Sequence, residues 1–296
     1  MSATTTSSIT NTGTTTTTTT TTTNTNTNTN TTRLPTFYLP HGGGPCFFMD
    51  NTRGAADMWA PMAAFLRGLI ATLAEKPRAV VVVSGHWEES AFTVNSAANP
   101  PLLFDYSGFP EHTYHLKYPV PGSPELARRV RSLLEGAGMA TGEDKQRGLD
   151  HGVFVPFMLI LPDADVPVVE VSLRGDLDAA EHLRAGAALA PLRDEGVLVV
   201  GTGMSFHNMR AFGPGAAAPS KQFDAWLSAA VTAPTAQARN DALATWERAP
   251  AARASHPREE HLLPLMVAAG AAGADLGRKV FEGQVLGATV SGFQFG

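Results

Sequence analysis

Residues 80–88 read VVVVSGHWE, and this stretch decides the fold class. Its valines follow the helix breaker Pro77, and such a short run of β-branched residues is typical of a strand buried on both faces of a sheet. The predicted strand spans Arg78 to Ser84, so His86 comes directly after it. A polar imidazole at the end of a buried strand needs a partner, either a hydrogen-bonding group or a metal ion.

Two other strand-like stretches lead into a histidine in the same way. TFYLP at 36–40 precedes His41, and VLVVGTGMSF at 197–206 precedes His207. In open α/β sheets, ligands bind in the crevice beyond the carboxyl ends of the strands. We therefore expect these imidazoles to converge there, as ligands of a metal with a proton-transfer residue beside it. For each histidine taken alone, an ordinary structural hydrogen bond remains open.

Two further histidines stand in short motifs. His151 lies in GLDHG, where Asp150 is placed to fix the tautomer of the imidazole, although the same residues also suit a turn. His261 ends HPREEH, so Glu259 or Glu260 could complete a site of two histidines and one carboxylate. The alternative is that both glutamates lie in a solvated first helical turn, where acidic residues are favoured.

Helix and strand patterns alternate over the rest of the chain. Ser123, Pro124 and Gly136 mark a helix with a cap, a first-turn proline and a stop. The run VFVPFMLILP after His151 contains Pro156 and fits neither pattern cleanly. Other helices are predicted at 58–73, 179–192, 222–231, 236–246 and 261–269, and other strands at 166–173 and near the C-terminus. The alternation predicts one α/β domain with a central mixed β-sheet flanked by helices, and a metal site at the strand carboxyl ends.

Composition limits the class of protein. Residues 1–32 are nearly pure Thr with Asn and Ser, so they are predicted to form a disordered tail, and residues 33–296 to form the domain. The net charge of −5, without a basic stripe, argues against nucleic acid as a partner. No apolar run reaches the roughly 18 residues that a transmembrane helix needs. The single cysteine, Cys46, is expected to be buried and predicts a reducing compartment, the cytoplasm, whereas His182 is expected at the surface of its helix.

His41 also begins an HGGG stretch, which forms the oxyanion loop in some α/β-hydrolases. That class of enzyme needs a G-x-S-x-G turn that presents a nucleophilic serine. The nearest stretch, Gly203 to His207, lacks the last glycine. The sequence therefore does not support a serine hydrolase, and the glycines equally allow the backbone to approach a bound ligand.

Several motifs, in this order, resemble those of class III extradiol ring-cleavage dioxygenases: PHGGGP, SGHWE, DYSGFPEHTYHLKYPVPGSPELA, GLDHGVFVP, PVVEVSL and HPREEHLLPLMVAAGAAG. The resemblance runs from about Thr36 to Gly296 and is closest to the branch of 4,5-DOPA extradiol dioxygenase-like proteins. It implies an α/β fold, one non-haem metal, and cleavage of a catechol ring beside its two hydroxyl groups.

The resemblance also implies roles for the histidines. By matching motifs, His41 and His86 would be metal ligands, with His261 as the third. Relatives that use a glutamate leave the third ligand open between His261, His207 and a neighbouring glutamate. His207 would act as the catalytic acid and base beside the metal, and His151 would line the substrate pocket and assist it.

The expected activity follows from these roles. Fe(II) is the metal expected for reaction of a catechol with O₂, which would give a ring-opened semialdehyde, whereas Zn(II) can occupy the same ligands in isolated protein. The wall of the substrate pocket is assigned to residues of the breaker-rich segment: Tyr106, Phe109, His112 and Tyr114. The alternatives are a metal-dependent hydrolase that uses the same histidines, and a catalytically inactive metal-binding relative. The oligomeric state stays open, a homo-oligomer included.

Overall fold

The structure is a computed structural model that describes residues 32–51 and 54–296. The predicted Thr-rich tail lies outside the described residues, except for Thr32. Within the described part of the chain, no helix is long and apolar enough to cross a membrane.

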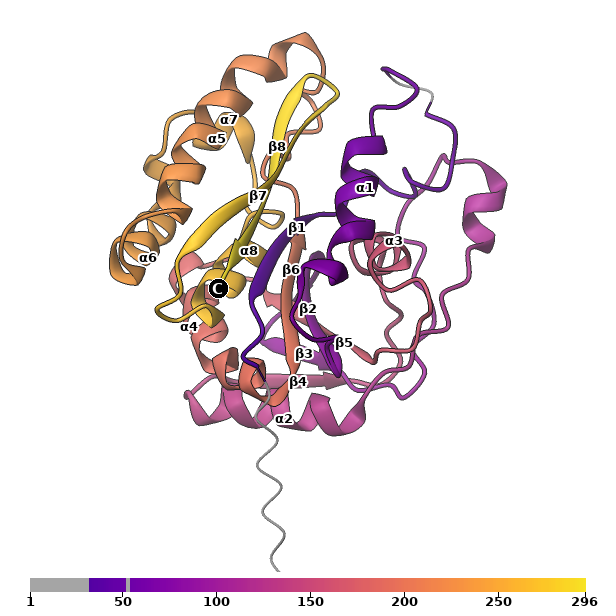
Figure 1. Ribbon diagram of the computed structural model, residues 1–296, viewed down its shortest axis with the longest axis vertical. Helices are drawn as coiled ribbons and strands as arrows, with labels where there is room; N and C mark the ends of the chain where they lie inside the picture. The colour runs from indigo at the N-terminus through magenta and orange to yellow at the C-terminus, as the bar shows by residue number, and fades with distance from the viewer. Residues whose placement is uncertain (1–31, 52–53) are drawn as a thin grey trace, which may run out of the picture. The chain divides into compact units, whose positions relative to one another are not determined.

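One mixed sheet of eight strands forms the centre of the described domain (Figure 1). Its order is β4-β3-β5-β2-β6-β1-β8-β7. The middle of the sheet is parallel, with β2 (Ala79–Glu89) between β5 (Val168–Arg174) and β6 (Val197–Gly203), and β1 (Thr36–Pro40) beyond β6. The parallel pairing brings the carboxyl ends of β1, β2 and β6 to one edge, so the predicted mixed α/β fold is confirmed.

The remaining strands flank this parallel centre. β8 (Ala288–Phe295) runs antiparallel to β1 and pairs with β7 (Gly277–Val285), as the strand-like C-terminal sequence predicted. β3 (Phe92–Asn95) and β4 (Thr141–Asp144) were not predicted. Both are only four residues long, and β4 reads TGED, which has no strand-like composition. Pairing within the sheet, rather than local preference, makes these two segments strands.

Strand β2 is longer than predicted, and this corrects the position of His86. The strand continues to Glu89, so His86 lies inside it rather than after it. Val83 pairs with Val171 of β5, and the next pair is Glu88 with Leu173, so β2 bulges between them. The bulge interrupts the ladder at His86 and re-aims its side chain, as β-bulges do beside functional sites.

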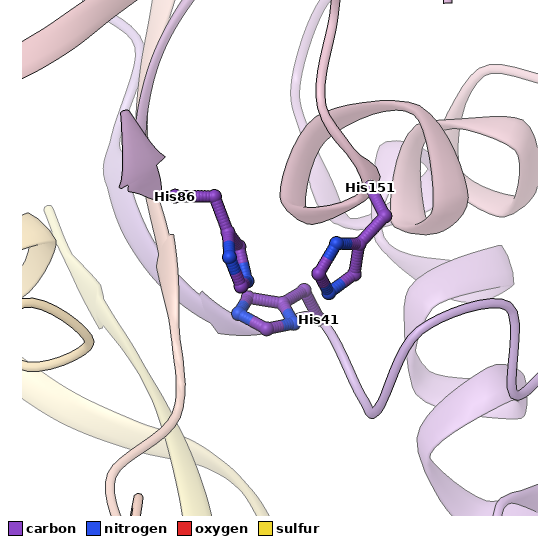
Figure 2. Close-up of side chains that lie close together, drawn as sticks. All are labelled: His41, His86 and His151. Carbon is purple, nitrogen blue, oxygen red and sulfur yellow. The ribbon is translucent and has the colours of Figure 1, made fainter. Parts of the chain in front are cut away.

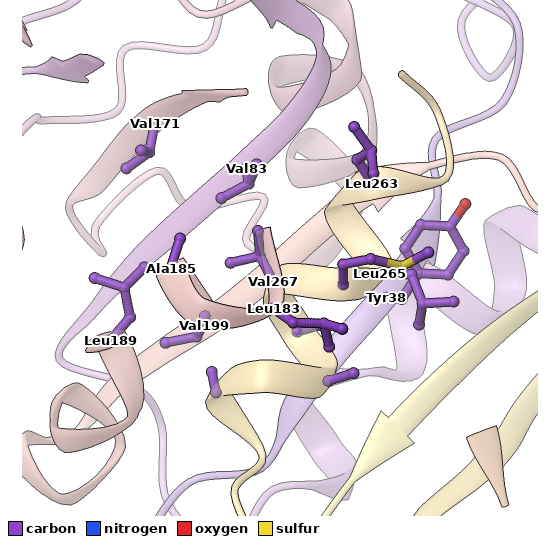
Figure 3. Packing of buried hydrophobic residues seen from close by; sticks show 14 of the residues in the cluster. Tyr38, Val83, Val171, Leu183, Ala185, Leu189, Val199, Leu263, Leu265 and Val267 are labelled. Carbon is purple, nitrogen blue, oxygen red and sulfur yellow. The ribbon is translucent and has the colours of Figure 1, made fainter. Parts of the chain in front are cut away.

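Helices cover both faces of the sheet, and the valines of β2 alternate between them. Val81 and Val83 join a core with helices α2, α4, α5, α6 and α8, part of which Figure 3 shows, whereas Val80 and Val82 join the core under α1 and α3. The helices are α1 (Ala60–Gly68), α2 (Pro124–Gly136), α3 (His151–Ile160), α4 (Ala179–Leu189), α5 (Ala217–Val231), α6 (Ala236–Ala244), α7 (Ala252–Ser255) and α8 (Leu263–Ala271).

Most predicted helices are present with shifted ends. α2 begins as predicted, with Ser123 Oγ accepting from Leu126 N, and Cys46 is buried as predicted. The run VFVPFMLILP, which fitted neither a helical nor a strand pattern, forms most of helix α3, and Pro156 lies inside this helix. Nearly all of its residues are buried, so it has no polar face and leaves no helical periodicity in the sequence.

The prediction that His182 lies at the surface is wrong. The side chain is fully buried, because α4 packs between α2 and α8. Its Nδ1 donates to Asp178 O at 2.7 Å, and its Nε2 accepts from Arg174 N at 3.2 Å. Burial lowers the pKa of His182, so the ring is neutral and satisfied by backbone groups. It is a structural histidine.

Candidate metal centre

Five histidines from separate elements meet at the carboxyl edge of the parallel strands. We call His41, His86, His151, His207 and His261 the histidine cluster. Figure 2 shows the rings of His41, His86 and His151 pointing toward one another, with ring centroids 4.0–5.4 Å apart. The ring centroid of His261 lies 4.6 Å from that of His86 and 5.2 Å from that of His41. The ring of His207 stacks on that of His261, with centroids 3.4 Å apart. The sequence prediction that strand-end histidines converge is confirmed.

Two glycines bring the His261 segment against the sheet. A Cβ on Gly203 would lie 2.1 Å from His261 O, and one on Gly85 would lie 3.0 Å from Glu260 O. At Gly203 only a residue without a side chain lets the backbones approach so closely, and at Gly85 a Cβ would be crowded. The carbonyl of His261 accepts from Tyr38 Oη at 2.7 Å and from Met204 N at 3.2 Å. The backbone of His261 is therefore fixed by β1 and by the end of β6.

The imidazoles of His41, His86 and His261 share one arrangement of their ring nitrogens. In each ring Nδ1 faces an oxygen: Gly42 O at 2.9 Å, Asp105 Oδ2 at 3.6 Å and Glu260 Oε1 at 3.0 Å, respectively. An Nδ1–H that donates to oxygen leaves the lone pair on Nε2, which is how most ligating histidines are held. His41 Nε2 is buried and has no hydrogen-bond partner in the described structure.

The spacing and the charge state of these nitrogens fit a divalent transition metal. His86 Nε2 and His261 Nε2 are 3.1 Å apart. Two imidazole nitrogens bound to one Zn(II) at about 2.0–2.1 Å would lie roughly 3.0–3.4 Å apart. Burial, with the neighbouring imidazoles adding to it, lowers the pKa of His86 to about 4 and those of His41 and His261 well below 6.5. All three rings are therefore neutral at pH 7, the form that binds metal.

Among the described residues, two sets of side chains with no member in common have the spacing to hold a metal ion. His41, His86 and His151 offer ligand atoms within 4.8 Å of one another, and so do His207, Glu260 and His261. Of the three predicted ligands, His41 and His86 belong to the first set and His261 belongs to the second. Since Glu260 lies on the Nδ1 side of His261, it is placed to orient that ring from behind rather than to share its Nε2 site.

Glu260 does not lie in a solvated first helical turn, which was one of the two interpretations of Glu259 and Glu260. Its Oε1 accepts from Nδ1 of both His207 and His261, each at 3.0 Å. Burial would raise the pKa of this carboxyl, but the hydrogen bonds from the two histidines outweigh burial and hold it well below its ordinary range. Glu259 instead accepts from Arg253 Nη1 at 2.6 Å. One ionised carboxylate therefore fixes the tautomers of two histidines.

A second carboxylate, Asp105, orients His151 on the other side of the histidine cluster, where the sequence had suggested Asp150. His151 Nδ1 donates to Asp105 Oδ1 at 2.8 Å, and the backbone N of His151 donates to the same oxygen at 2.9 Å. The prediction that Asp150 fixes His151 is wrong. Asp150 accepts from Ser84 Oγ at 2.8 Å and pairs with Arg147 Nη2 at 3.2 Å. Asp105 lies in the irregular segment 99–121, where only its place in the DYSGFP motif could have indicated it.

A buried ionic group that the sequence did not indicate lies under the bulge of β2. Arg147 sits 4.5 Å from the centre of the Trp87 ring and pairs with Asp150, and its Nε is 3.9 Å from Glu170 Oε1. Asp150 and Glu170 are fully buried. Burial and the nearby Asp150 raise the pKa of Glu170 well above its ordinary value. The Arg147 guanidinium thus lies beside two buried acidic side chains, Asp150 and Glu170.

The predicted pocket residues lie mostly on the His151 side of the cluster. The Tyr106 ring is 5.8 Å from His151, and the rings of Phe109 and Tyr114 lie 5.4 and 5.3 Å from Tyr106. His112 is exposed and its Nε2 contacts Phe48 O at 3.0 Å. The structure also adds Phe104 and Phe154, which pack against Tyr106 and which sequence reasoning missed because they lie in stretches without a regular pattern.

The serine of the incomplete elbow is not presented as a nucleophile. Ser205, the serine of the incomplete elbow, is buried, and its Oγ accepts from Ser291 N at 2.8 Å. The glycines of the loop serve packing: Gly44 has φ +53°, and a Cβ there would lie 2.7 Å from the Phe109 ring. The loop brings His41 and Phe109 together.

Comparison with known proteins places this arrangement in a family. Residues 35–294 match the family described as the catalytic LigB subunit of aromatic ring-opening dioxygenase. The chain is 40% identical over 244 residues to a 4,5-DOPA dioxygenase extradiol of Beta vulgaris, covering 80% of this chain and 87% of that protein. It is 34% identical over 247 residues to the Escherichia coli K12 protein of the same name, covering 81% and 86%.

Other relatives extend over most of the chain. The dioxygenase tasH of Hapsidospora irregularis is 34% identical over 281 residues, 88% of this chain and 85% of that protein. A crystal structure of an uncharacterised Escherichia coli K12 protein superposes with a TM-score of 0.70 at 29% identity, covering 89% of this chain and all of that one. The chain thus belongs to the LigB family of aromatic ring-opening dioxygenases, the class III extradiol enzymes.

Proposed function

We propose that the protein is a non-haem, metal-dependent extradiol dioxygenase that opens the ring of a small catechol with O₂ and yields a ring-opened semialdehyde. The observation that carries the proposal is the set of three neutral imidazoles, two buried and His86 partly buried, whose Nδ1 atoms lie near oxygens. Nε2 of His86 and of His261 are 3.1 Å apart, and His41 Nε2 has no hydrogen-bond partner among the described residues. We assign the activity to residues 33–296. The names of the relatives support the reaction type.

His41, His86 and His261 would hold the metal, Fe(II) in the active enzyme. The chemistry that Fe(II) supplies in such a site is acidification of a catechol hydroxyl group and exchange of electrons with O₂. A site with only a few protein ligands suits this reaction, because the substrate and O₂ would both need space at the metal. Zn(II) also binds imidazole nitrogen, in general more tightly than Fe(II), but it has no redox chemistry, so it would fill the site without supporting the reaction.

His207 is placed to move the substrate proton. Its Nδ1–H is held by Glu260 Oε1 at 3.0 Å, so Nε2 carries a lone pair that can accept a proton. Its ring is stacked on His261, which keeps it beside the metal position. The protonated His207 would later return the proton as an acid, with Glu260 stabilising the charged ring.

His151 and the aromatic group beside it would hold the ring of the catechol. Asp105 fixes His151 in the tautomer with a free Nε2, which can hydrogen-bond a catechol oxygen. Tyr106, Phe109 and Tyr114 provide an apolar wall near it, and the exposed His112 stands at the outer side of this group. Aromatic side chains bind a planar ring through stacked or edge-to-face contact.

The test is oxygen uptake by Fe(II)-loaded protein across a panel of catechols. We expect about one O₂ consumed per ring opened, a yellow product, no reaction without O₂, and no turnover by Zn(II)-loaded protein. Hydrolysis of esters that needs no O₂, together with no catechol turnover, would assign a metal-dependent hydrolase instead. Tight metal binding without turnover of either class would assign an inactive relative.

A further inference from the structure

The backbone of β2 around His86 lies outside the ladders of the sheet. The register of β2 with β6 ends at Ser84, and the register with β5 passes from Val83 directly to Glu88. In the described part of the chain, residues 85–87 therefore have no paired residue in either neighbouring strand. Backbone N–H and C=O groups that leave a ladder need other partners. The groups that hold the His86 backbone thus determine where its imidazole points.

The other two proposed ligands are held by backbone groups at the end of β6. His41 N donates to Gly203 O at 3.2 Å, and Met204 N donates to His261 O at 3.2 Å. His86 N instead donates to a side chain, Ser84 Oγ, at 3.2 Å. The position of the His86 backbone therefore depends on a side chain, which the position of His41 N does not.

A closed chain of hydrogen bonds surrounds the backbone of His86. Ser84 Oγ, which accepts from His86 N, donates to Asp150 Oδ1 at 2.8 Å. Asp150 Oδ2 accepts from Arg147 Nη2 at 3.2 Å, and the same Nη2 donates to His86 O at 3.4 Å. The chain thus begins at the N–H of His86 and returns to its carbonyl oxygen. We call Ser84, Asp150 and Arg147 the bulge support.

The bulge support is itself held firmly. The Asp150 side chain is fully buried, and Arg147 packs 4.5 Å from the centre of the Trp87 ring. The backbone of Arg147 is fixed as well, because its N donates to Asp144 Oδ1 at 2.8 Å. Hydrogen bonds to a charged partner are stronger than those between neutral groups. The pair of Asp150 and Arg147 therefore keeps Ser84 Oγ in one place.

Close packing connects the bulge support to the His86 ring. A Cβ on Gly152 would lie 2.6 Å from Ser84 Oγ and 2.9 Å from Cδ2 of the His86 ring. The same Cβ would lie 3.1 Å from Asp150 Oδ1. Glycine at this position lets the first turn of α3 contact the bulge support and the ring together. In such a densely packed site, a shift of Ser84 or Asp150 changes the space that the ring occupies.

We propose that Ser84, Asp150 and Arg147 are positioning residues for His86, which hold the bulge of β2 so that Nε2 of this ring meets the metal ion. The inference rests on the proposed function, because that function makes His86 a ligand. The three residues act through the backbone of His86 and take no part in the chemistry. Their effect is on the affinity and the coordination geometry of the metal.

The test uses two readouts that need neither substrate nor O₂: Zn(II) affinity by competition with a chelator, and the visible spectrum of Co(II)-loaded protein. We expect Ser84→Ala to weaken Zn(II) binding by roughly 10- to 100-fold, as for other groups that orient metal ligands. The Co(II) bands should shift, because they report the arrangement of the ligands. A merely structural role would lower the melting temperature and leave the bands in place.

Ser220→Ala is the matched control. Ser220 is buried like Ser84, and its Oγ also makes two hydrogen bonds, donating to Ala217 O at 3.2 Å and accepting from Thr289 N at 2.9 Å. It lies in α5 and is not part of the bulge support. The control variant loses the same kind of buried hydrogen bonds, so its melting temperature shows their general cost, and both metal readouts should stay unchanged.

A second pair of variants tests the next member of the bulge support. Asp150→Asn keeps an oxygen that accepts from Ser84 Oγ, whereas Asp150→Ala removes it, so the Asn variant should retain more of the Zn(II) affinity. Arg147 is left in place, because its removal would leave the buried Asp150 and Glu170 without a counter-charge and destabilise the fold for an unrelated reason. If Ser84→Ala does not fold, this pair decides.

The outcomes separate this inference from the function it rests on. If Ser84→Ala or Asp150→Ala binds Zn(II) as tightly as the wild type, with unchanged Co(II) bands, the inference is wrong while the dioxygenase proposal stands. Equal losses in Asp150→Asn and Asp150→Ala would likewise exclude the route through Ser84. If the wild-type protein binds neither Zn(II) nor Co(II), the metal centre of the proposed function fails, and the inference fails with it.

Discussion

His86 Nε2 lies 3.1 Å from His261 Nε2, although 175 positions separate the two residues along the chain. Both rings have Nδ1 turned toward a carboxylate, Asp105 for His86 and Glu260 for His261. Glu260 lies within hydrogen-bond distance of His261 Nδ1 and so leaves the lone pair of that ring on Nε2, facing His86 Nε2 across 3.1 Å. A metal ion bound by both nitrogens would suit this spacing.

Replacing a proposed ligand should therefore remove the metal. We expect His41→Ala, His86→Ala and His261→Ala each to lose most of the bound metal in elemental analysis, because each removes one coordinate bond. His115→Ala is the control, since the His115 side chain is 72% exposed and pairs with Glu111 at the surface. Full metal occupancy in His261→Ala would transfer the third position to Glu260 or His207.

His207 should act on protons more than on the metal. His207→Ala is expected to keep most of its iron and to bind catechol, while turnover falls by roughly 10²–10⁴-fold, the usual share of acid–base catalysis. Elemental analysis, anaerobic catechol titration and oxygen uptake measure the three quantities on one sample. Loss of iron along with turnover would make His207 a ligand, and the assignment of the proton carrier would have to change.

The sequence predicted those parts of the fold whose signal is local. The strands before His41 and His207, and the valines before His86, have a composition that fits a buried parallel strand in any surroundings. Helix α2 was equally clear, because Ser123 and Pro124 provide its start within two residues. The meeting of the histidines followed from topology, since parallel strands end at one edge of the sheet.

The parts that failed depend on distant neighbours. His182 is buried because its ring lies 5.1 Å from the Phe92 ring of β3 and accepts from Arg174 N at the end of β5. These contacts come from distant segments, which helix periodicity does not encode. Asp105 replaced Asp150 as the partner of His151 because an irregular segment returns to the site from 46 positions away. Hydrogen bonds between loops depend on the tertiary structure, so the sequence pattern of one segment does not predict them.

Buried neutral histidines should make the metal-free protein sensitive to acid, and His256 allows this to be tested outside the metal centre. His256 is fully buried, with Nε2 2.9 Å from Ser205 O, and burial lowers its pKa from 6.5 to about 4. Between these values the unfolded chain binds more protons than the folded one. His256 therefore costs no stability above pH 6.5, and its penalty grows to about 3 kcal/mol as the pH falls to 4.

Glutamine at this position should reduce the acid sensitivity. The amide of His256→Gln can donate to Ser205 O but does not titrate, so the free energy of unfolding should fall less steeply between pH 6.5 and 4 than in the wild type. Urea unfolding of metal-free protein at several pH values measures the slope. His115→Gln, at an exposed histidine, should leave it unchanged. Equal slopes for His256→Gln and wild type would show that His256 is not neutral in the folded protein.

Asp105 should act as a positioning residue for His151. In Asp105→Asn the amide has nearly the same size but can present an N–H to Nδ1, which favours the wrong tautomer of the imidazole. We expect turnover at saturating Fe(II) to fall by roughly 10- to 100-fold, as for other groups that orient catalytic histidines, with the melting temperature unchanged. Glu111→Gln is the control, because Glu111 is an exposed acid of the same segment and pairs with His115 at the surface.

A double-mutant cycle separates orientation of His151 from a general effect on the site. Asp105 lies 2.8 Å from His151 Nδ1 but 3.6 Å from His86 Nδ1, so its main effect should pass through His151. In a His151→Ala background, Asp105→Asn should then cost much less turnover than it does in the wild type, because residues that act as a unit are not additive. If the cost is the same in both backgrounds, Asp105 acts through His86, and Zn(II) affinity measured by competition with a chelator should fall in the single variant.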